Sequence, residues 1–213
     1  NSLINLHNAN QLDDLIDLIT SFEIVFWEVF FLVPVGRGQE IPLITADQFE
    51  KAFEKIYRLS KDVPFLIKIT EAPHYRRYYF DQEILRDGGD LASVRRSGID
   101  LPAYMRKLQG PGGSIGRAPS GVNSGKGFIF ISHRGEVFPS GFLPLCAGDF
   151  RKQPLKTIYQ DSALLRELRD PSLLKGRCGL CPYNEICGGS RSRAYAMTGD
   201  YLAEDPCCNF QPD

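Results

Sequence analysis

The stretch VFWEVFFLV, residues 25–33, is almost continuously apolar and predicts a β-strand that is buried on both faces. A second run of the same kind, PFLIKIT at residues 64–70, follows it. Between the two, Thr45 and Gln48 have the spacing of a capping box, which predicts the start of a helix whose apolar side chains share one face: Phe49, Ala52, Phe53, Ile56 and Tyr57. A strand, a helix and a strand in this order predict parallel pairing through a right-handed crossover, and hence the α/β fold class.

Other elements are predicted on either side of this unit. Before it, Leu12, Leu15, Ile16 and Ile19 form one face of a helix. After it, residues 110–127 contain seven glycines and predict a loop or linker. The pattern then predicts a hairpin over 127–141, short helices around 155–159 and 162–169, and a last helix over 190–197 that ends at Gly199.

Composition limits the class of protein. The chain has 213 residues, 43% hydrophobic and 24% charged, with a formal net charge of -1, as expected for one large or two small globular domains. The longest apolar stretch, residues 22–35, is too short to span a bilayer and is interrupted by Glu23 and Glu28. No signal-peptide pattern begins at Asn1. We therefore expect a cytoplasmic protein that binds neither membrane nor nucleic acid.

Five of the six cysteines lie in the last 36 residues, with the spacing Cys178-x2-Cys181-x5-Cys187 followed by Cys207 and Cys208. Two cysteines separated by two residues can bind one centre, and a third cysteine with one of the distant pair completes four thiolate ligands. The spacing is one-sided, unlike the repeated short gaps of zinc ribbons, so it favours an iron-sulfur cluster over structural zinc or disulfides. Nearby glycines and arginines suit an anionic centre: Gly179, Gly188, Gly189, Arg177, Arg191 and Arg193.

Candidate cavity residues follow the two predicted strands. Trp27 is expected in the core, whereas Glu28 points to the opposite face. Arg37 lies just past the first strand, and the second strand is followed by His74, Arg76 and Arg77. Ligands of α/β sheets bind at the carboxyl ends of the strands, so we expect a site there for an anionic substrate or a cofactor carboxylate. The alternative is that these residues form a solvated loop.

The cysteine tail, CGLCPYNEICGGSRSRAYAMTGDYLAEDPCC at residues 178–208, resembles the auxiliary-cluster segment, called SPASM or in its shorter form twitch, of radical S-adenosylmethionine (SAM) enzymes. Three further stretches are similar to later parts of the same proteins: WEVFFLVPVGRG at 27–38, ITEAPHYRR at 69–77 and FISHRGEVFPSGFLPL at 130–145. They are most similar to the branch that makes heme d1 or heme from siroheme. The resemblance covers essentially the whole chain.

The resemblance implies the C-terminal half of a partial (β/α)6 radical SAM barrel over residues 1–85, a glycine-rich linker over 86–126, and a small α+β SPASM/twitch iron-sulfur domain over 127–213. It implies one auxiliary 4Fe-4S cluster, with Cys178, Cys181, Cys187 and Cys208 as ligands and Cys207 as the alternative fourth ligand. A two-cluster tail would have a cysteine where Arg191 stands. Cys146 has no partners for a second cluster and is expected to be a small buried apolar residue.

The Cys-x3-Cys-x2-Cys triplet that binds the SAM-cleaving cluster in this family is absent. The resemblance therefore implies an enzyme only as the full-length protein, with SAM and a second 4Fe-4S cluster in a half that lies outside this chain and could be encoded separately. It also implies an electron donor and a small-molecule or peptide substrate, with a tetrapyrrole among the candidates. The alternative function is a non-enzymatic module in which four cysteines bind structural zinc.

Overall fold

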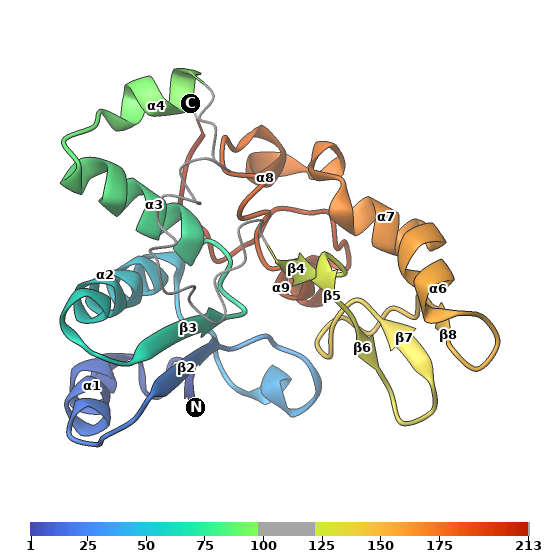
Figure 1. The fold of residues 1–213 in the computed structure, drawn as a ribbon, viewed down its shortest axis with the longest axis horizontal. Coiled ribbons are helices and arrows are strands. Elements are labelled where there is room, and N and C mark those ends of the chain that lie inside the picture. The colour runs from blue at the N-terminus through green and yellow to red at the C-terminus, as the bar shows by residue number, and fades with distance from the viewer. Residues whose placement is uncertain (98–121, 213) are drawn as a thin grey trace.

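A parallel sheet forms the first half of the chain. The computed structural model describes residues 1–97 and 122–212 as a mixed α/β structure (Figure 1). Three strands, β1 (Ser2–Ile4), β2 (Phe26–Phe31) and β3 (Leu66–Thr70), lie in the order β1-β2-β3, and both pairs are parallel. The predicted strand-helix-strand unit with parallel pairing is confirmed.

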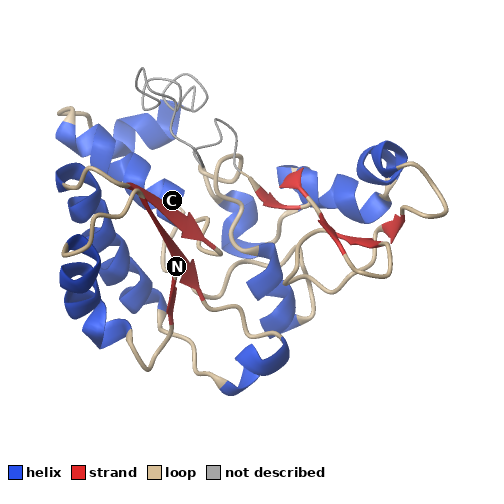
Figure 2. Cartoon of the chain, turned by 60° about the horizontal axis from the view of Figure 1, so that its bottom comes forward, coloured by secondary structure: helices blue, strands red, loops and turns tan. Residues whose placement is uncertain are grey.

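Three helices cover one face of this sheet: α1 (Leu12–Thr20), α2 (Ala46–Asp62) and α3 (Tyr75–Arg86) (Figures 1 and 2). The predicted capping box begins α2, since the Gln48 N–H donates to Thr45 Oγ1 at 3.2 Å and the Thr45 N–H donates to Gln48 Oε1 at 2.8 Å. The remaining elements of this half are short: η1 (Ala9–Gln11), η2 (Gly36–Glu40) and α4 (Leu91–Ser97).

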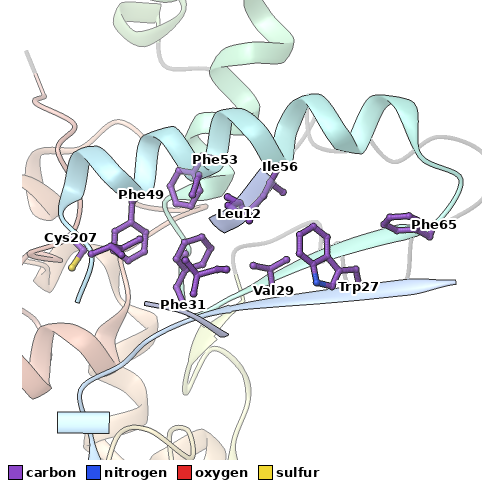
Figure 3. Close-up of a cluster of buried hydrophobic side chains, with 13 residues drawn as sticks. Leu12, Trp27, Val29, Phe31, Phe49, Phe53, Ile56, Phe65 and Cys207 are labelled. Atoms are coloured by element: carbon purple, nitrogen blue, oxygen red, sulfur yellow. The ribbon is translucent and has the colours of Figure 1, made fainter. Parts of the chain in front are cut away.

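The two faces of β2 differ. Trp27, Val29 and Phe31 are fully buried and pack against α2, where Phe49 stacks on Phe31 and Phe53 meets it edge to face (Figure 3). Successive side chains of a strand alternate between faces, so the residues between them point away from the helices. The expectation that this strand is buried on both faces is therefore wrong: Glu28 and Phe30 line an open cavity on the helix-free side.

The second half contains short strands and helices. Two small sheets pair β4 (Asn123–Ser124) with β5 (Gly127–Phe128) and β6 (Phe130–Ile131) with β7 (Glu136–Phe138) and β8 (Gly148–Asp149). The antiparallel β6–β7 pair is the predicted hairpin. The helical elements are α6 (Leu155–Asp161), α7 (Ala163–Arg169), η3 (Pro171–Leu173), α8 (Gly176–Leu180) and α9 (Arg191–Thr198).

The predicted end of the last helix is confirmed. Gly199 adopts a left-handed conformation with φ of 77° and caps α9 through its N–H, which donates to the Tyr195 carbonyl. Most of the glycine-rich stretch predicted as a linker, residues 110–121, lies outside the described residues. Within the described ranges, no helix is both long and apolar enough to cross a membrane.

The aromatic core predicts a large cost for truncation. Phe53 is 0% exposed and contacts the rings of Phe31, Phe49 and His74, so we expect Phe53→Ala to lower the free energy of unfolding by about 3–5 kcal/mol. Urea denaturation measures the change. Leu18→Ala is the control, because Leu18 is 54% exposed and should change stability little. Equal effects of the two substitutions would contradict the assigned core.

Candidate metal centre

The cysteine loops bring four thiols to one place. Cys178 lies within α8, Cys181 follows the end of that helix, and Cys187 closes the turn after it. Cys208 arrives from the C-terminal segment, and all four cysteines line a single small pocket. The pKa of Cys187 is raised by burial and also by the other three thiols, which confirms that they are close together: Cys178, Cys181 and Cys208.

Protein N–H groups point at this sulfur set. The Gly189 N–H donates to Cys187 Sγ at 3.3 Å, and the Asp205 N–H donates to Cys178 Sγ at 3.4 Å. Arg191 Nη2 lies 3.7 Å from Cys178 Sγ. Hydrogen bonds of this kind stabilise negative charge on thiolate ligands and are typical of iron-sulfur sites, so the donor set fits a group bound by thiolates.

Gly189 permits this close approach. It has φ of 65°, and a Cβ atom at this position would lie 3.1 Å from Cys178 Sγ and 2.8 Å from Asp205 Cβ. Any larger side chain would push the loop away from the sulfur atoms. Glycine is therefore required both by the backbone conformation and by the space.

Burial raises the pKa of Cys181 and of Cys208 to about 11, so these two thiols are protonated at neutral pH in the metal-free chain. A metal or cluster must therefore displace protons as it binds. The four thiols line one pocket but do not yet form a coordination site, because among the described residues no set of three or more His, Cys, Asp or Glu side chains is placed to hold a metal ion; binding would have to draw the thiols together.

The other two cysteines lie elsewhere. Cys207 is 4% exposed and belongs to the hydrophobic core, where Figure 3 shows it beside Phe49 at one end of α2. Cys208, not Cys207, thus reaches the pocket of the other three cysteines. Cys146 is exposed, so the expectation that it is a buried apolar residue is wrong. Its place in a loop after β7 leaves it on the surface.

A large cavity adjoins the side of β2 that points away from the helices and extends past β3, the edge strand, to α3 and to Ser60 of α2. Its volume is about 820 Å³, and its other walls come from β4, β5 and the turn after β7. Glu28 lies in it and accepts hydrogen bonds from Lys68 Nζ at 2.7 Å and Thr70 Oγ1 at 2.8 Å. Burial would raise the pKa of Glu28, but these two hydrogen bonds together with nearby positive charge, chiefly that of Lys68, outweigh burial and lower it.

Of the basic residues predicted at the strand ends, only Arg76 lines this cavity. Its Nη1 donates to the Ile186 carbonyl at 3.2 Å, so the same side chain reaches the loop just before Cys187. Burial lowers the pKa of Arg76, and no carboxylate in residues 1–97 or 122–212 forms an ion pair with it. Among the described residues, Arg76 is thus a cation without a carboxylate partner, between the cavity and the cysteines.

The structure does not gather the remaining three residues there. Arg37 is exposed in η2, away from the cavity lining. Arg77 is buried and forms ion pairs with Glu50 and Asp81. His74 is 1% exposed, packs against the rings of Phe49 and Phe53, and borders the cysteine pocket.

His74 is neutral in this environment. Burial lowers its pKa to about 3, although the neighbouring Asp205 opposes the shift. Neither ring nitrogen has a hydrogen-bond partner within the described part of the chain, and Nδ1 lies 3.8 Å from Asp205 Oδ2. The side chain therefore fills space between the aromatic core and the cysteine pocket.

A buried ion pair that the sequence did not predict joins the two halves of the site. Arg193 and Asp205 are both 0% exposed and form two hydrogen bonds of 3.0 and 2.9 Å. Arg193 Nη1 also donates to the Glu71 carbonyl at 2.8 Å, at the end of β3. Burial would raise the pKa of Asp205, but the Arg193 guanidinium outweighs burial and lowers it well below its usual range.

Breaking this pair should be costly. We expect Asp205→Asn to lower the free energy of unfolding by about 3–5 kcal/mol, because it leaves the buried Arg193 charge uncompensated. Urea denaturation followed by far-ultraviolet circular dichroism measures this. Asp13→Asn is the control, since Asp13 is 68% exposed in its pair with Lys55. A loss for Asp205→Asn no larger than that of the control would contradict the role given to the pair.

Comparisons with known proteins point to one group of enzymes. The chain is 37% identical over its whole length to an AdoMet-dependent heme synthase of Methanosarcina barkeri, of which it covers 56%. It is 34% identical to a protein of the same name from Nitratidesulfovibrio vulgaris and covers 53% of it. It is 36% identical over 96% of its length to a pre-heme d1 synthase of Dinoroseobacter shibae and covers half of that protein.

A shorter match concerns another enzyme. Over 88 residues, 41% of the chain, it is 33% identical to a PqqA peptide cyclase of Methylocella silvestris. No family model matches the chain. The chain spans about half the length of the curated relatives that it matches over its whole length.

Proposed function

Since the chain is homologous to the C-terminal part of SPASM-type radical SAM enzymes of the heme-biosynthesis branch, we propose that it binds one auxiliary 4Fe-4S cluster through Cys178, Cys181, Cys187 and Cys208. The observation that carries this proposal is the convergence of these four cysteines on one pocket into which protein N–H groups point. Four thiolate ligands are the usual ligand set of such a cluster. When bound, the cluster would accept an electron or bind substrate.

In the complete protein, residues 1–85 would form part of a (β/α)6 barrel, and the open face of β2 and β3 would face its interior. The half that binds SAM and the second 4Fe-4S cluster would close this barrel. The proposed activity is reductive cleavage of SAM followed by abstraction of a hydrogen atom from a substrate. In this chain, that substrate would lie in the 820 Å³ cavity.

The cavity suits a large and largely apolar substrate with an anionic group. Phe30, Phe128 and Phe142 supply apolar surface, and Arg76 supplies a half-buried positive charge with no carboxylate partner in the described part of the chain. The relatives named for heme and pre-heme d1 favour a tetrapyrrole over a peptide. Arg76 would bind a carboxylate at the wall of the cavity nearest Cys187.

Zinc binding as the sole function finds no support in the comparisons. The relatives matched over the whole chain are named as AdoMet-dependent or heme-forming enzymes. Colour tells the two apart, because an iron-sulfur protein is brown and a zinc protein is colourless.

Cluster binding makes a quantitative prediction. Anaerobic reconstitution with iron and sulfide should load about four irons per chain, measured by iron and sulfide analysis and visible absorption. Alanine substitution of any one of Cys178, Cys181, Cys187 or Cys208 should abolish stable loading. Cys146→Ala and Cys207→Ala are matched controls that should keep it, because these thiols lie outside the pocket. Full loading by Cys208→Ala with loss in Cys207→Ala would mean that the fourth ligand is wrong.

SAM cleavage makes a separate prediction. The chain has no Cys-x3-Cys-x2-Cys triplet, so the isolated chain with dithionite and SAM should form no 5'-deoxyadenosine above a chain-free control. Chromatography of the nucleoside products measures this. Turnover by the reconstituted chain would show that the tail cluster itself cleaves SAM, contrary to the proposed division of roles.

A further inference from the structure

Glu71 has an unusual backbone. It follows the last residue of β3 and has φ of 59°, and in residues 1–97 and 122–212 no other residue except glycine has a positive φ. This conformation is unfavourable for a residue with a Cβ atom and persists only where the surroundings enforce it. Such strain is most often found where a side chain must be presented at a site of binding or catalysis.

The buried ion pair enforces this conformation. The Glu71 carbonyl accepts a hydrogen bond from Arg193, whose guanidinium is fixed by Asp205. On the side chain, Ser190 Oγ donates to Glu71 Oε2 at 2.9 Å, and the Ser190 N–H donates to Asp205 Oδ2 at 2.8 Å. The backbone carbonyl and the side-chain carboxyl of Glu71 are therefore both hydrogen-bonded by residues that lie next to the cysteine loops.

One carboxyl oxygen of Glu71 is left for a ligand. Glu71 is part of the cavity wall, and Oε1 has no hydrogen-bond partner among the described residues. Three neighbouring residues shift the pKa of Glu71 in addition to burial: Ser190 and Arg193 lower it, and Asp205 raises it. Burial is the largest effect, and the pKa of Glu71 lies above its ordinary value of 4.5.

We propose that Glu71 is the proton-exchanging residue of the cavity, which gives a proton to, or takes one from, a polar group of a ligand bound against β3. In the forward direction the Oε1–H bond breaks and the proton joins a lone pair of an oxygen or nitrogen atom of the ligand. Glu71 is then a carboxylate that keeps its hydrogen bond from Ser190. The reverse transfer regenerates the acid. The identification of this ligand with the substrate rests on the proposed function. The experiment below requires only the folded chain.

Infrared difference spectroscopy of the full chain tests this directly. Protonated carboxyl groups have a carbonyl stretching band separate from the amide bands, and Glu71→Gln identifies the band of Glu71. We expect this band to titrate with a midpoint above pH 4.5 and to shift to lower frequency at once when the native chain is transferred to D2O. Ser190→Ala should move the midpoint upward, because it removes a hydrogen bond that favours the carboxylate.

Glu50→Gln is the matched control. Burial also raises the pKa of Glu50, but that residue lies on α2, pairs with Arg77 and does not line the cavity. Its substitution should leave the Glu71 band and its exchange unchanged. If Glu71→Gln does not fold, Glu71→Asn keeps a residue type that tolerates positive φ and also removes the carboxylic acid.

Two outcomes would overturn the proposal. A band that resists exchange in D2O for hours would mark Glu71 as a sealed structural group, and a midpoint at or below pH 4.5 would mean that it is an ordinary carboxylate. Iron content measured in parallel keeps the two questions separate, because Glu71→Gln should load iron like the native chain. A native chain that loads no iron would contradict cluster binding without changing the infrared result.

Discussion

The buried ion pair between Arg193 and Asp205 is the interaction on which the site depends. Arg193 is on α9, yet it donates to the carbonyls of Leu32 and Glu71 at the ends of β2 and β3. Asp205 accepts from the Ser190 N–H, and its own N–H donates to Cys178 Sγ. One pair of charges therefore joins the carboxyl end of the sheet to the cysteine loops. A charge at 0% exposure is tolerated only when its partners are complete, which makes this junction more sensitive to single substitutions than the exposed ion pairs elsewhere.

Strand alternation explains how one short sheet serves both core and cavity. The odd-numbered residues of β2 fill the space under α2, and Glu28 and Phe30 face the cavity. Because β3 is paired in parallel and in register, Lys68 and Thr70 fall on the same side as Glu28 and hydrogen-bond to it. Glu28, the charged residue of an otherwise apolar strand, is thus stabilised by hydrogen bonds from the neighbouring strand. The Glu28 carboxylate also forms an ion pair with Lys68. Arg76 therefore remains as the cavity cation without a carboxylate partner in the described ranges.

Much of the fold could be predicted because it rests on local patterns. The capping box at Thr45, the apolar strands and Gly199 each determine backbone conformation within a few residues, and the structure has all of them. The site was harder to predict, because the sequence places His74, Arg76 and Arg77 together, whereas the first turn of α3 points them in three directions. His74 enters the core, Arg76 faces the cavity, and Arg77 pairs with Glu50. The spacing of residues also did not predict a role for Glu71, although Glu71 lies in the stretch 69–77 that resembles radical SAM enzymes. Its importance comes from contacts with residues more than a hundred positions away.

The adjacent residues Cys207 and Cys208 have the same side chain but lie in different environments, the first in the hydrophobic core and the second in the cysteine pocket. Asp205 faces Arg193, and the turn that it begins is closed by the Cys208 N–H, which donates to the Asp205 carbonyl at 3.2 Å. The Cys207 N–H donates to Asp205 Oδ1, which fixes Cys207 against Phe49 and the aromatic core. The next side chain, Cys208, lines the pocket with Cys178, Cys181 and Cys187. Exchanging the two roles would require breaking the hydrogen bonds of Asp205 and removing Cys207 from the core. The ion pair that joins the two halves therefore also selects which cysteine faces the pocket.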